Sequence, residues 1–282
     1  MENQPVVAII GAGVMGEAII SGLLNNKLTV PGQIRASDPL QERRIELQTK
    51  YGIIPAADNP AAVRNAEVVI LSVKPQRLDR VLSSLRNQIP PSALLLSIVA
   101  GASIEQISQQ LNHKIIVRAM PNTPAQIGEG ITVWTTSATV SPEQVELARQ
   151  ILNALGQEVY MEEEYYLDMA TALSGTGPAY IFLFMEAMID AGVHLGFPRR
   201  IAEQLVTQTI LGSVKYYQHR KVHPATLRNE VTSPGGTSAA AIYYLEKAGV
   251  RTAISRAVWA AYERSQELGK GKTSQSPENH DQ

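Results

Sequence analysis

The chain has 282 residues and carries 25 Lys and Arg against 26 Asp and Glu, which gives a formal net charge of −1 at pH 7. It contains no cysteine, so disulfides, thiolate metal sites, iron–sulfur ligation and a cysteine nucleophile are excluded. The balanced charge and an aromatic content of only 5% argue against a dedicated nucleic-acid binder, which needs a basic surface and rings on which bases stack.

Targeting and membrane segments are not expected either. The beginning of the sequence, MENQPVVAII, lacks the basic stretch and long apolar run of a signal peptide. Apolar runs elsewhere stop short of the roughly 18 residues that a spanning helix needs. The most apolar stretch, residues 179–193, contains Glu186 and Asp190. We therefore expect a soluble, cytoplasmic protein with no membrane partner.

The first part of the chain, up to about residue 160, alternates short β-branched runs with helical patterns. The runs lie at residues 6–10, 68–73, 94–99 and 114–118, and the helical patterns at 14–26, 40–51, 77–87 and 104–112. Ser141 and Pro142 are typical of an N-cap and first helical turn, so they predict a further helix. Such alternation predicts βαβ units around a parallel sheet, whose strands are continuously apolar because both faces are covered.

From about Tyr165 the pattern becomes almost entirely helical, with helices predicted at residues 178–195, 199–218, 235–248 and 251–268. We place the domain boundary near residue 162, so that residues 1–162 form the α/β domain and residues 163–268 a helical domain. The acidic run Glu162, Glu163 and Glu164 is interpreted as the solvated start of a helix. Residues 269–282 contain no apolar residue and are predicted to be a disordered tail.

The first helix of this second half, at residues 178–192, is apolar on nearly every face. A helix of that kind needs to be buried all round. A half-domain of this size does not easily bury it alone, so we predict a subunit interface in which helices of two chains pack together. A central core helix in a monomer is the alternative.

The segment GAGVMG, residues 11–16, follows the first predicted strand directly and opens the first predicted helix. In this pattern Gly11 permits a tight turn, Gly13 omits a Cβ where a pyrophosphate approaches the backbone, and Gly16 lets helix and strand pack closely. The pyrophosphate would lie on free N–H groups at the positive end of the helix. The segment therefore predicts a dinucleotide site formed by Gly11, Ala12, Gly13, Val14, Met15 and Gly16.

A further strand is predicted to end in the segment IRASDP, residues 34–39, and the residues there bear on the choice between NAD and NADP. An acid at this place binds the ribose 2′-hydroxyl of NAD, whereas a small hydroxyl with nearby arginines suits the 2′-phosphate of NADP. The chain offers both, because Ser37 and Asp38 are followed by Arg43 and Arg44. The two arginines can equally form an exposed helix face, so these residues leave the choice open.

Further cofactor contacts are predicted where the strand at residues 68–73 ends, since the carboxyl ends of parallel strands face the ligand. The residues there are Ser72, Val73, Lys74 and Pro75. Lys74 can face a phosphate, the ribose or only water. Asn59 is interpreted as an adenine-side contact or as a helix N-cap.

A second candidate site is formed by Ser233, Pro234, Gly235, Gly236, Thr237 and Ser238. The glycines and the proline leave N–H groups unpaired where an apolar helix begins, and the hydroxyls add donors, a combination that suits a carboxylate. Ordinary helix capping explains the same residues. No metal site is predicted, because His219 and His223 have no acid between them and lie beside basic residues, and Pro224 is interpreted as ending their segment.

Six segments together resemble the pyrroline-5-carboxylate reductase family, over nearly the whole chain to about residue 268. They are IIGAGVMG (9–16), LSVKP (71–75), RAMPNTP (118–124), GEGITV (128–133), SGTGPAY (174–180) and VTSPGGTS (231–238). The resemblance implies an N-terminal Rossmann domain and a C-terminal helical domain that dimerises by interleaving, with dimers that can assemble into decamers.

The resemblance also implies an activity. The family reduces the cyclic imine 1-pyrroline-5-carboxylate to L-proline with NADPH or NADH, the last step of proline biosynthesis, and we expect NADP(H) to be preferred and NAD(H) to be usable. By resemblance, residues 233–238 hold the substrate carboxylate. A hydroxyl near the imine nitrogen then donates or relays a proton while hydride reaches the imine carbon.

The chain departs from the family pattern at this hydroxyl. The family usually carries threonine two residues after the second glycine, where this chain has Ser238, preceded by Thr237. We predict Ser238 as the proton donor, with Thr237 as the alternative. A β-hydroxyacid dehydrogenase shares the glycine pattern, but Lys215, the nearest candidate for its catalytic lysine, lacks the required spacing to glycine and asparagine. A non-catalytic dinucleotide sensor is the remaining alternative, and the hydroxyl-rich loop speaks against it.

Overall fold

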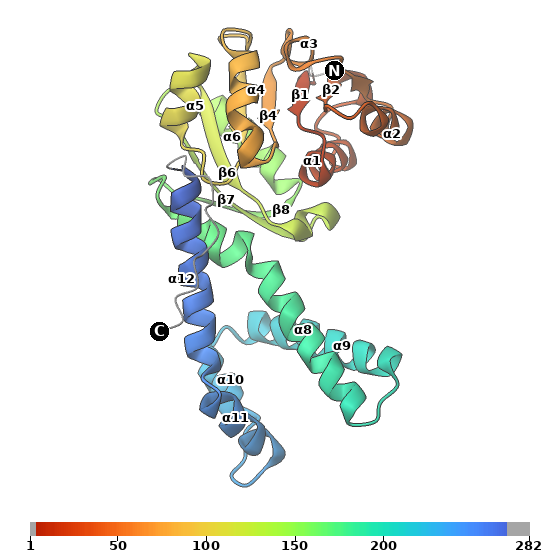
Figure 1. Cartoon of the computed structure of the whole chain (residues 1–282), viewed down its shortest axis with the longest axis vertical. Helices are drawn as coiled ribbons and strands as arrows, with labels where there is room; N and C mark the ends of the chain where they lie inside the picture. Colours follow the sequence, from red (N-terminus) through yellow and green to blue (C-terminus); the bar gives the residue numbers. More distant parts are fainter. Residues whose placement is uncertain (1–3, 270–282) are drawn as a thin grey trace, which may run out of the picture. The chain divides into compact units, whose positions relative to one another are not determined.

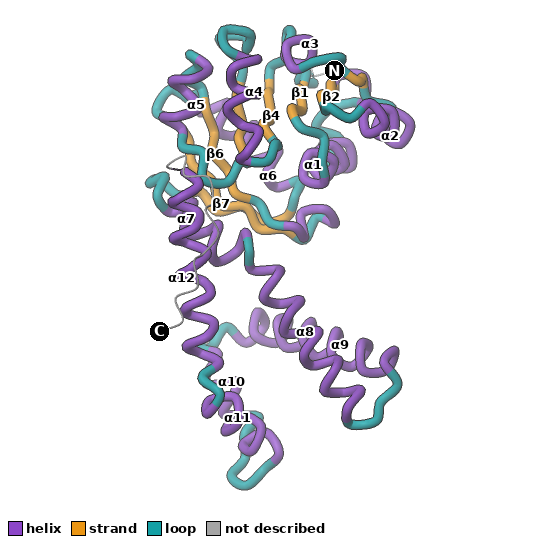
Figure 2. Tube along the Cα trace, in the orientation of Figure 1, coloured by secondary structure: helices purple, strands orange, loops and turns teal. Residues whose placement is uncertain are grey.

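A computed structural model describes residues 4–269 of the chain. The last strand ends at Tyr160, and from there to residue 269 the structure contains only helices and loops (Figures 1 and 2). By contacts the chain divides into two compact units, one of Met1–Thr176 with the chain from Ala260 onward, the other of Gly177–Trp259. The boundary near residue 162 stays a prediction, since these contacts group residues 163–176 with the sheet. The predicted tail lies outside the described residues, except that Gly269 ends the last helix.

The first unit is built on an eight-stranded sheet with the strand order β3-β2-β1-β4-β5-β6-β7-β8. The strands are β1 (Val7–Ile10), β2 (Ile34–Ser37), β3 (Ile54–Pro55), β4 (Val68–Leu71), β5 (Leu94–Ser97), β6 (Ile116–Met120), β7 (Gly130–Thr136) and β8 (Gly156–Tyr160). The strands β1 to β6 all run parallel to one another, in the order of a doubly wound dinucleotide-binding domain. The predicted parallel α/β sheet is confirmed.

Helices cover both faces of this sheet. They are α1 (Val14–Asn25), α2 (Gln41–Tyr51), α3 (Asn59–Val63), α4 (Leu78–Leu85), α5 (Ile104–Leu111), α6 (Pro142–Asn153) and α7 (Tyr166–Ala170). Short 3-10 turns lie at Pro31–Gln33, Pro75–Arg77 and Thr123–Ile127. The helix predicted after Ser141 is present, and the Ser141 side chain forms a capping box with Gln144.

Successive residues of each central strand enter different cores. In β1, Val7 and Ile9 belong to a cluster that includes residues of α1 and α6, whereas Ala8 and Ile10 belong to a cluster with residues of α3, α4 and α5. All four are fully buried. Because a strand's side chains point alternately to opposite faces, a sheet covered on both sides needs an uninterrupted apolar run.

Three strands were not given bounds from the sequence: the two-residue β3, and β7 and β8. β7 pairs antiparallel with β6 and parallel with β8. Its sequence, GITVWTT, mixes polar and apolar residues, and buried residues alternate with partly exposed ones over Gly130–Trp134. Gly130 and Gly156 face each other where β7 and β8 begin, and a Cβ on Gly156 would lie 2.1 Å from the Gly130 carbonyl oxygen. The close approach of the two backbones explains this glycine pair.

The interpretation of residues 162–164 as a solvated helix start is wrong for Glu164. The Arg118 guanidinium, on β6, donates to Glu164 at 2.8 Å and to Asp168 at 3.0 Å, and the Arg118 side chain is only 6% exposed. Glu164 also accepts the Ile104 N–H at 2.8 Å, and Asp168 accepts the Ser265 hydroxyl at 2.9 Å. A buried arginine therefore joins β6 to α5, to α7 and to the end of the last helix.

The remaining helices are α8 (Gly177–His194), α9 (Arg199–Arg220), α10 (Pro224–Glu230), α11 (Thr237–Lys247) and α12 (Val250–Gly269), with a π turn at Thr171–Gly175 between α7 and α8. The four predicted long helices are confirmed. The short α10 was not predicted, because Pro224 was interpreted as ending a segment. Pro224 instead occupies the first turn, behind a His223 side chain that accepts the Ala225 N–H at 3.2 Å.

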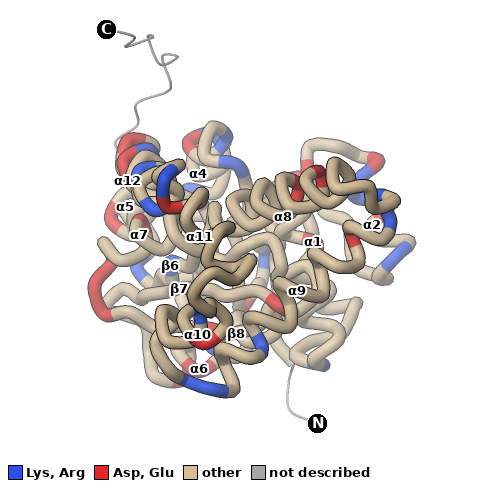
Figure 3. The backbone as a smooth tube through the Cα atoms, turned by 90° about the horizontal axis from the view of Figure 1, so that it is seen from below, with Lys and Arg blue, Asp and Glu red and all other residues tan. Residues whose placement is uncertain are grey.

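In a single chain, α8 buries none of its residues. It packs along α9, yet Phe182 is 61% and Leu183 67% exposed. Its only charged residues are Glu186 and Asp190, so its tube is otherwise tan in Figure 3. By length and composition alone, the helical stretch Tyr166–His194, with mean hydropathy 1.3, passes the test for a membrane span, although we expected none. One such stretch is weak evidence for a membrane span.

Candidate dinucleotide and carboxylate sites

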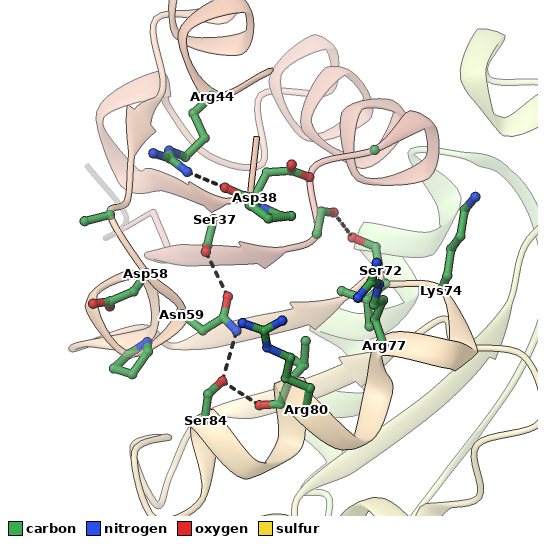
Figure 4. A pocket seen from close by; sticks show the side chains of 17 residues that line it. Ser37, Asp38, Arg44, Asp58, Asn59, Ser72, Lys74, Arg77, Arg80 and Ser84 are labelled. Carbon is green, nitrogen blue, oxygen red and sulfur yellow. Dashed lines mark hydrogen bonds between the residues drawn. The ribbon is translucent and has the colours of Figure 1, made fainter. Parts of the chain in front are cut away.

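A cavity of about 890 Å³ lies at the carboxyl ends of β1, β2 and β4, where the direction of strand order reverses (Figure 4). Ligands of open α/β sheets bind at such a point. Of the predicted cofactor residues, those that line the cavity are Gly11, Gly13, Ser37, Asp38, Asn59, Ser72, Val73 and Lys74. Those that do not line it are Ala12, Val14, Met15, Gly16 and Pro75.

The glycine turn has the geometry that the motif predicts. Gly11 has φ +89°, and a Cβ on it would lie 2.6 Å from a methyl group of Val73. A Cβ on Gly16 would lie 2.4 Å from the Gly11 carbonyl oxygen, so this glycine permits α1 to pack against the turn. A Cβ on Gly13 meets no atom within 4 Å, and Gly13 lines the cavity. The space beside Gly13 is therefore open to a ligand.

The first turn of α1 is suited to an anion. Gly13 is the N-cap, no side chain caps the turn, and Val14 in that turn is 57% exposed. Unpaired N–H groups at the positive end of a helix attract negative charge, by about 0.3–1 kcal/mol at an exposed position. The open space at Gly13 and these donors together fit the pyrophosphate of a dinucleotide.

Asp38 is engaged within the protein. One carboxylate oxygen accepts the Ala12 N–H at 3.1 Å and the other accepts the Leu40 N–H at 3.0 Å. The sequence offered Asp38 as an acceptor for a ribose 2′-hydroxyl. In the structure its two oxygens hold the end of β2 against the glycine turn, and the Arg44 guanidinium donates to its backbone carbonyl (Figure 4).

Ser37 and Asn59 lie together in the cavity wall at the end of β2. The Ser37 hydroxyl donates to the Asn59 side-chain oxygen at 2.8 Å, and the Asn59 amide donates to the Ser84 hydroxyl at 3.0 Å (Figure 4). Asn59 does not cap α3, since the side chain that accepts an N–H there is that of Asp58. On the opposite side, the Ser72 hydroxyl donates to the Gly11 carbonyl, so this side chain braces the turn.

The cavity wall carries four cationic side chains, from Arg44, Lys74, Arg77 and Arg80, against the acids Asp38 and Asp58. Arg77 and Arg80 were missed from the sequence. Their spacing in the sequence could have identified them. The helix after β4 begins at the edge of the sheet where ligands bind, and residues three apart share a helix face. Arg43 is absent from the cavity wall, so the structure separates the two neighbouring arginines.

Arg43 belongs to a network behind the glycine turn. Its Nε donates to the Ala12 carbonyl at 2.8 Å, and its terminal nitrogens pair with Glu46 at 2.8 Å and with Glu17. Glu17 lies in the first turn of α1 and also accepts from Lys50 at 2.7 Å and Tyr51 at 3.0 Å. Burial raises the pKa of Glu17, but these hydrogen bonds outweigh it and lower the pKa to about 2.

The second candidate site, in the helical unit, is a tight turn leading into α11. The Gly236 N–H donates to the Ser233 carbonyl at 3.0 Å, and Gly235 has φ +72°. Pro234 and Gly235 thus occupy the central positions that a type II turn requires. Gly236 is the N-cap of α11 and no side chain caps that helix. A Cβ on Gly236 would lie 2.6 Å from the Ser233 hydroxyl, which explains the second glycine.

These features define a class. A doubly wound sheet with an uncapped glycine turn at its switch point is the architecture of a dinucleotide-dependent oxidoreductase. Residues 6–101 match the family model described as "NADP oxidoreductase coenzyme F420-dependent", and residues 164–268 match "Pyrroline-5-carboxylate reductase dimerisation".

Comparison with known proteins gives the particular family. The chain is 45% identical to the pyrroline-5-carboxylate reductase of Synechocystis sp., over 94% of this chain and 98% of that protein. It is 41% identical to the enzyme of Methanosarcina acetivorans, over 96% and 100%. A crystal structure of Plasmodium falciparum pyrroline carboxylate reductase with NADP bound has TM-score 0.87 and 32% identity, and covers 95% of this chain and 99% of that one.

The chain belongs to the pyrroline-5-carboxylate reductase family and is an NAD(P)H-dependent oxidoreductase. The β-hydroxyacid dehydrogenase alternative is not needed, and Lys215 lies exposed on α9. The match to the family's dimerisation domain covers all of α8 to α12 up to residue 268, so the predicted self-association through the helical half is supported. Homo-oligomerisation also explains the exposed apolar surface of α8 better than a membrane does.

Proposed function

We propose that this chain reduces 1-pyrroline-5-carboxylate to L-proline, the last step of proline biosynthesis, in the cytoplasm. The observation that carries the proposal is the combination, in one member of this family, of a cationic dinucleotide cavity with a second uncapped, glycine-rich helix start. The substrate carries one carboxylate and one cyclic imine. It therefore needs an anion site and a proton donor in addition to the cofactor.

The residues on the cofactor side of the site bind the dinucleotide and orient it. The first turn of α1 binds the pyrophosphate, and the end of β2 with Asn59 faces the adenosine. When bound, the reduced nicotinamide supplies the hydride that converts the imine carbon to an amine carbon. Because the cofactor brings the electron pair, the protein's larger contribution is to align the two reactants.

The substrate side is the turn of residues 233–238. Its N–H groups and the hydroxyl of Ser233 hold the substrate carboxylate. The hydroxyl of Ser238 lies next to the imine nitrogen and donates or relays one proton to it, with Thr237 as the alternative donor. An iminium accepts hydride more readily than a neutral imine, so this proton makes the imine carbon reactive. Hydride and proton together give the secondary amine of L-proline.

One assay tests the activity directly. The purified full-length chain is mixed with pyrroline-5-carboxylate and with NADPH or NADH, and the loss of reduced-cofactor absorbance is followed. We expect oxidation of the cofactor that depends on substrate and yields L-proline. If neither cofactor is oxidised, the proposed reaction is wrong.

Variants of the two hydroxyls identify the proton donor. We expect Ser238→Ala to lower kcat by roughly 10²–10⁴-fold, the usual contribution of a positioned acid, with unchanged NADPH affinity. Ser238→Thr keeps the hydroxyl and restores the family's usual residue, so it retains activity. Thr237→Val is the matched control. If Thr237→Val loses turnover and Ser238→Ala does not, the roles are exchanged.

We further propose that NADPH is preferred and NADH is usable. Three arginines line the cavity, Arg44, Arg77 and Arg80, and the carboxylate of Asp38 is already engaged by two backbone N–H groups. A hydrogen bond to a charged group contributes about 1.5–3 kcal/mol. Arg44→Ala and Arg80→Ala should therefore each lower kcat/KM for NADPH by roughly tenfold or more and change that for NADH little. Equal losses for both cofactors would contradict this assignment.

We also propose that residues 163–268 form one substrate-binding and dimerisation domain, and that dimers assemble further, up to a decamer. The exposed apolar side chains of α8 support a large helical interface. Light scattering coupled to size-exclusion chromatography gives the mass in solution. A monomer at micromolar concentration would refute the interface, and a stable dimer would refute the decamer alone.

A further inference from the structure

The peptide groups of the glycine turn are held from outside the turn. The Gly11 N–H donates to the Ser37 carbonyl at 2.9 Å, and the Gly11 carbonyl accepts from Ser72. Ala12 is held at both ends as well, because its N–H donates to Asp38 at 3.1 Å and its carbonyl accepts from Arg43 Nε at 2.8 Å. Of these contacts, only the last comes from a side chain of α2.

The contact with Arg43 determines where the next N–H points. The Ala12 carbonyl and the Gly13 N–H belong to one peptide group, and they point in opposite directions because the described chain has no cis peptide bond. Gly13 lines the cavity, whereas Arg43 and the residues clustered around it, Glu17, Lys50 and Tyr51, do not. A carbonyl held toward Arg43 therefore turns the Gly13 N–H toward the cavity.

Arg43 is itself well fixed. Its side chain is 19% exposed, and it pairs with Glu17 of α1 and Glu46 of α2. Glu17 is anchored in turn by Lys50 and Tyr51. The guanidinium thus has partners on two helices and on the turn, so it cannot swing away without breaking several charge-assisted hydrogen bonds.

We propose that Arg43 is a positioning residue for cofactor binding: through the Ala12 carbonyl it orients the Gly13 N–H toward the pyrophosphate. Arg43 then sets affinity for the pyrophosphate part of any dinucleotide, whereas its neighbour Arg44, in the cavity wall, faces the adenosine side. The inference rests on the proposed placement of the pyrophosphate at the first turn of α1.

Two fragments of the cofactor separate these roles. ADP-ribose contains the pyrophosphate and lacks a 2′-phosphate, and adenosine 2′-monophosphate contains the 2′-phosphate and lacks a pyrophosphate. Each is titrated by calorimetry into the full-length chain. We expect Arg43→Met to weaken ADP-ribose binding roughly tenfold, as expected for one misdirected donor to a charged group, and to leave binding of adenosine 2′-monophosphate within about twofold.

Two further variants make the test specific. Glu42→Gln removes an exposed acid in the first turn of α2, where Arg43 pairs instead with Glu17 and Glu46, and should change binding of neither fragment. Arg43→Lys keeps a cation beside Glu17 but lacks the Nε donor, so it should weaken ADP-ribose selectively, and it carries the test if Arg43→Met does not fold.

Three results would overturn the proposal. They are unchanged ADP-ribose affinity in the Arg43 variants, an equal loss for both fragments, and a loss of ADP-ribose affinity in Glu42→Gln equal to that in the Arg43 variants. An equal loss for both fragments would mean that Arg43 only supports α2 and the end of β2. Failure of the wild-type chain to bind ADP-ribose would instead overturn the placement of the pyrophosphate itself.

Discussion

The carboxylate of Glu17 should make the stability of the sheet unit depend on pH. In the folded chain its pKa lies at about 2 instead of 4.5, because hydrogen bonds from Lys50, Arg43 and Tyr51 outweigh the effect of burial. A lowered folded-state pKa means that the unfolded chain takes up its proton first as the pH falls. The stabilisation is therefore complete above about pH 4.5 and is lost as the pH falls toward 2.

The size of the effect follows from the shift. A difference of about 2.5 pKa units at roughly 1.4 kcal/mol per unit corresponds to about 3 kcal/mol. The Glu17 side chain is 20% exposed, so solvent screens it little, whereas Lys50 is 57% exposed and its share is reduced by salt. Glu17→Gln should thus lower the free energy of unfolding by about 2–3 kcal/mol at pH 7.

Urea unfolding of the wild type and of Glu17→Gln at pH 7, 4.5 and 3 measures this difference in the free energy of unfolding. The protein concentration is kept fixed, because association of the chains contributes to stability. The difference between wild type and Glu17→Gln should shrink steadily below pH 4.5. Glu105→Gln is the matched control, since Glu105 also lies in a first helical turn but is exposed, with only Gln109 donating to it. A wild-type advantage below about 0.5 kcal/mol, or one that does not change with pH, would refute the reasoning.

Three other substitutions have defined outcomes. Arg118→Met leaves two partly buried carboxylates without their cation and should destabilise the chain by about 3 kcal/mol, seen as a melting temperature lower by several degrees; a change below about 1 °C would contradict the buried network. Gly13→Ala should weaken NADP binding with little loss of stability, whereas Gly16→Ala should lower the melting temperature, because its Cβ would lie 2.4 Å from the Gly11 carbonyl oxygen; the opposite order would contradict the assigned roles. Phe182→Asp should give a smaller particle by light scattering, since an acid replaces an aromatic ring that is 61% exposed in the single chain; an unchanged mass would place Phe182 outside the interface.

The hydrophobic pattern of the sequence was sufficient to predict those strands in which every residue is buried. The strands β1 and β4 are apolar at every position and the helices after them have clear starts, so both were predicted within two residues at each end. β7 was missed because polar residues interrupt its apolar ones and it runs antiparallel to β6, a pairing that depends on the partner strand and not on its own sequence.

The roles of the site residues show a different limit of prediction from sequence. The sequence placed Asp38 correctly after β2, but its role depends on which N–H groups lie within reach, and those belong to residues 12 and 40. The adjacent arginines Arg43 and Arg44 are alike in sequence, yet one holds a carbonyl behind the turn and the other lines the cavity. Hydrogen-bond partners distant in the chain decide such roles, and periodicity carries no information about them.

The two proposed anion sites share one structural feature, a helix that begins at a glycine. This feature explains how a chain with net charge −1 binds two anionic ligands. In α3, α5 and α6, the side chains of Asp58, Ser103 and Ser141 accept an N–H of the first turn. In α1 and α11 the N-cap is Gly13 or Gly236, in an extended conformation and with no side-chain acceptor. A serine at either position would provide an acceptor for the donors that an anion needs. The glycines therefore leave the positive helix ends available to the pyrophosphate and the substrate carboxylate, so that these two anionic groups are recognised locally and the cations needed for the cofactor are confined to the wall of one cavity.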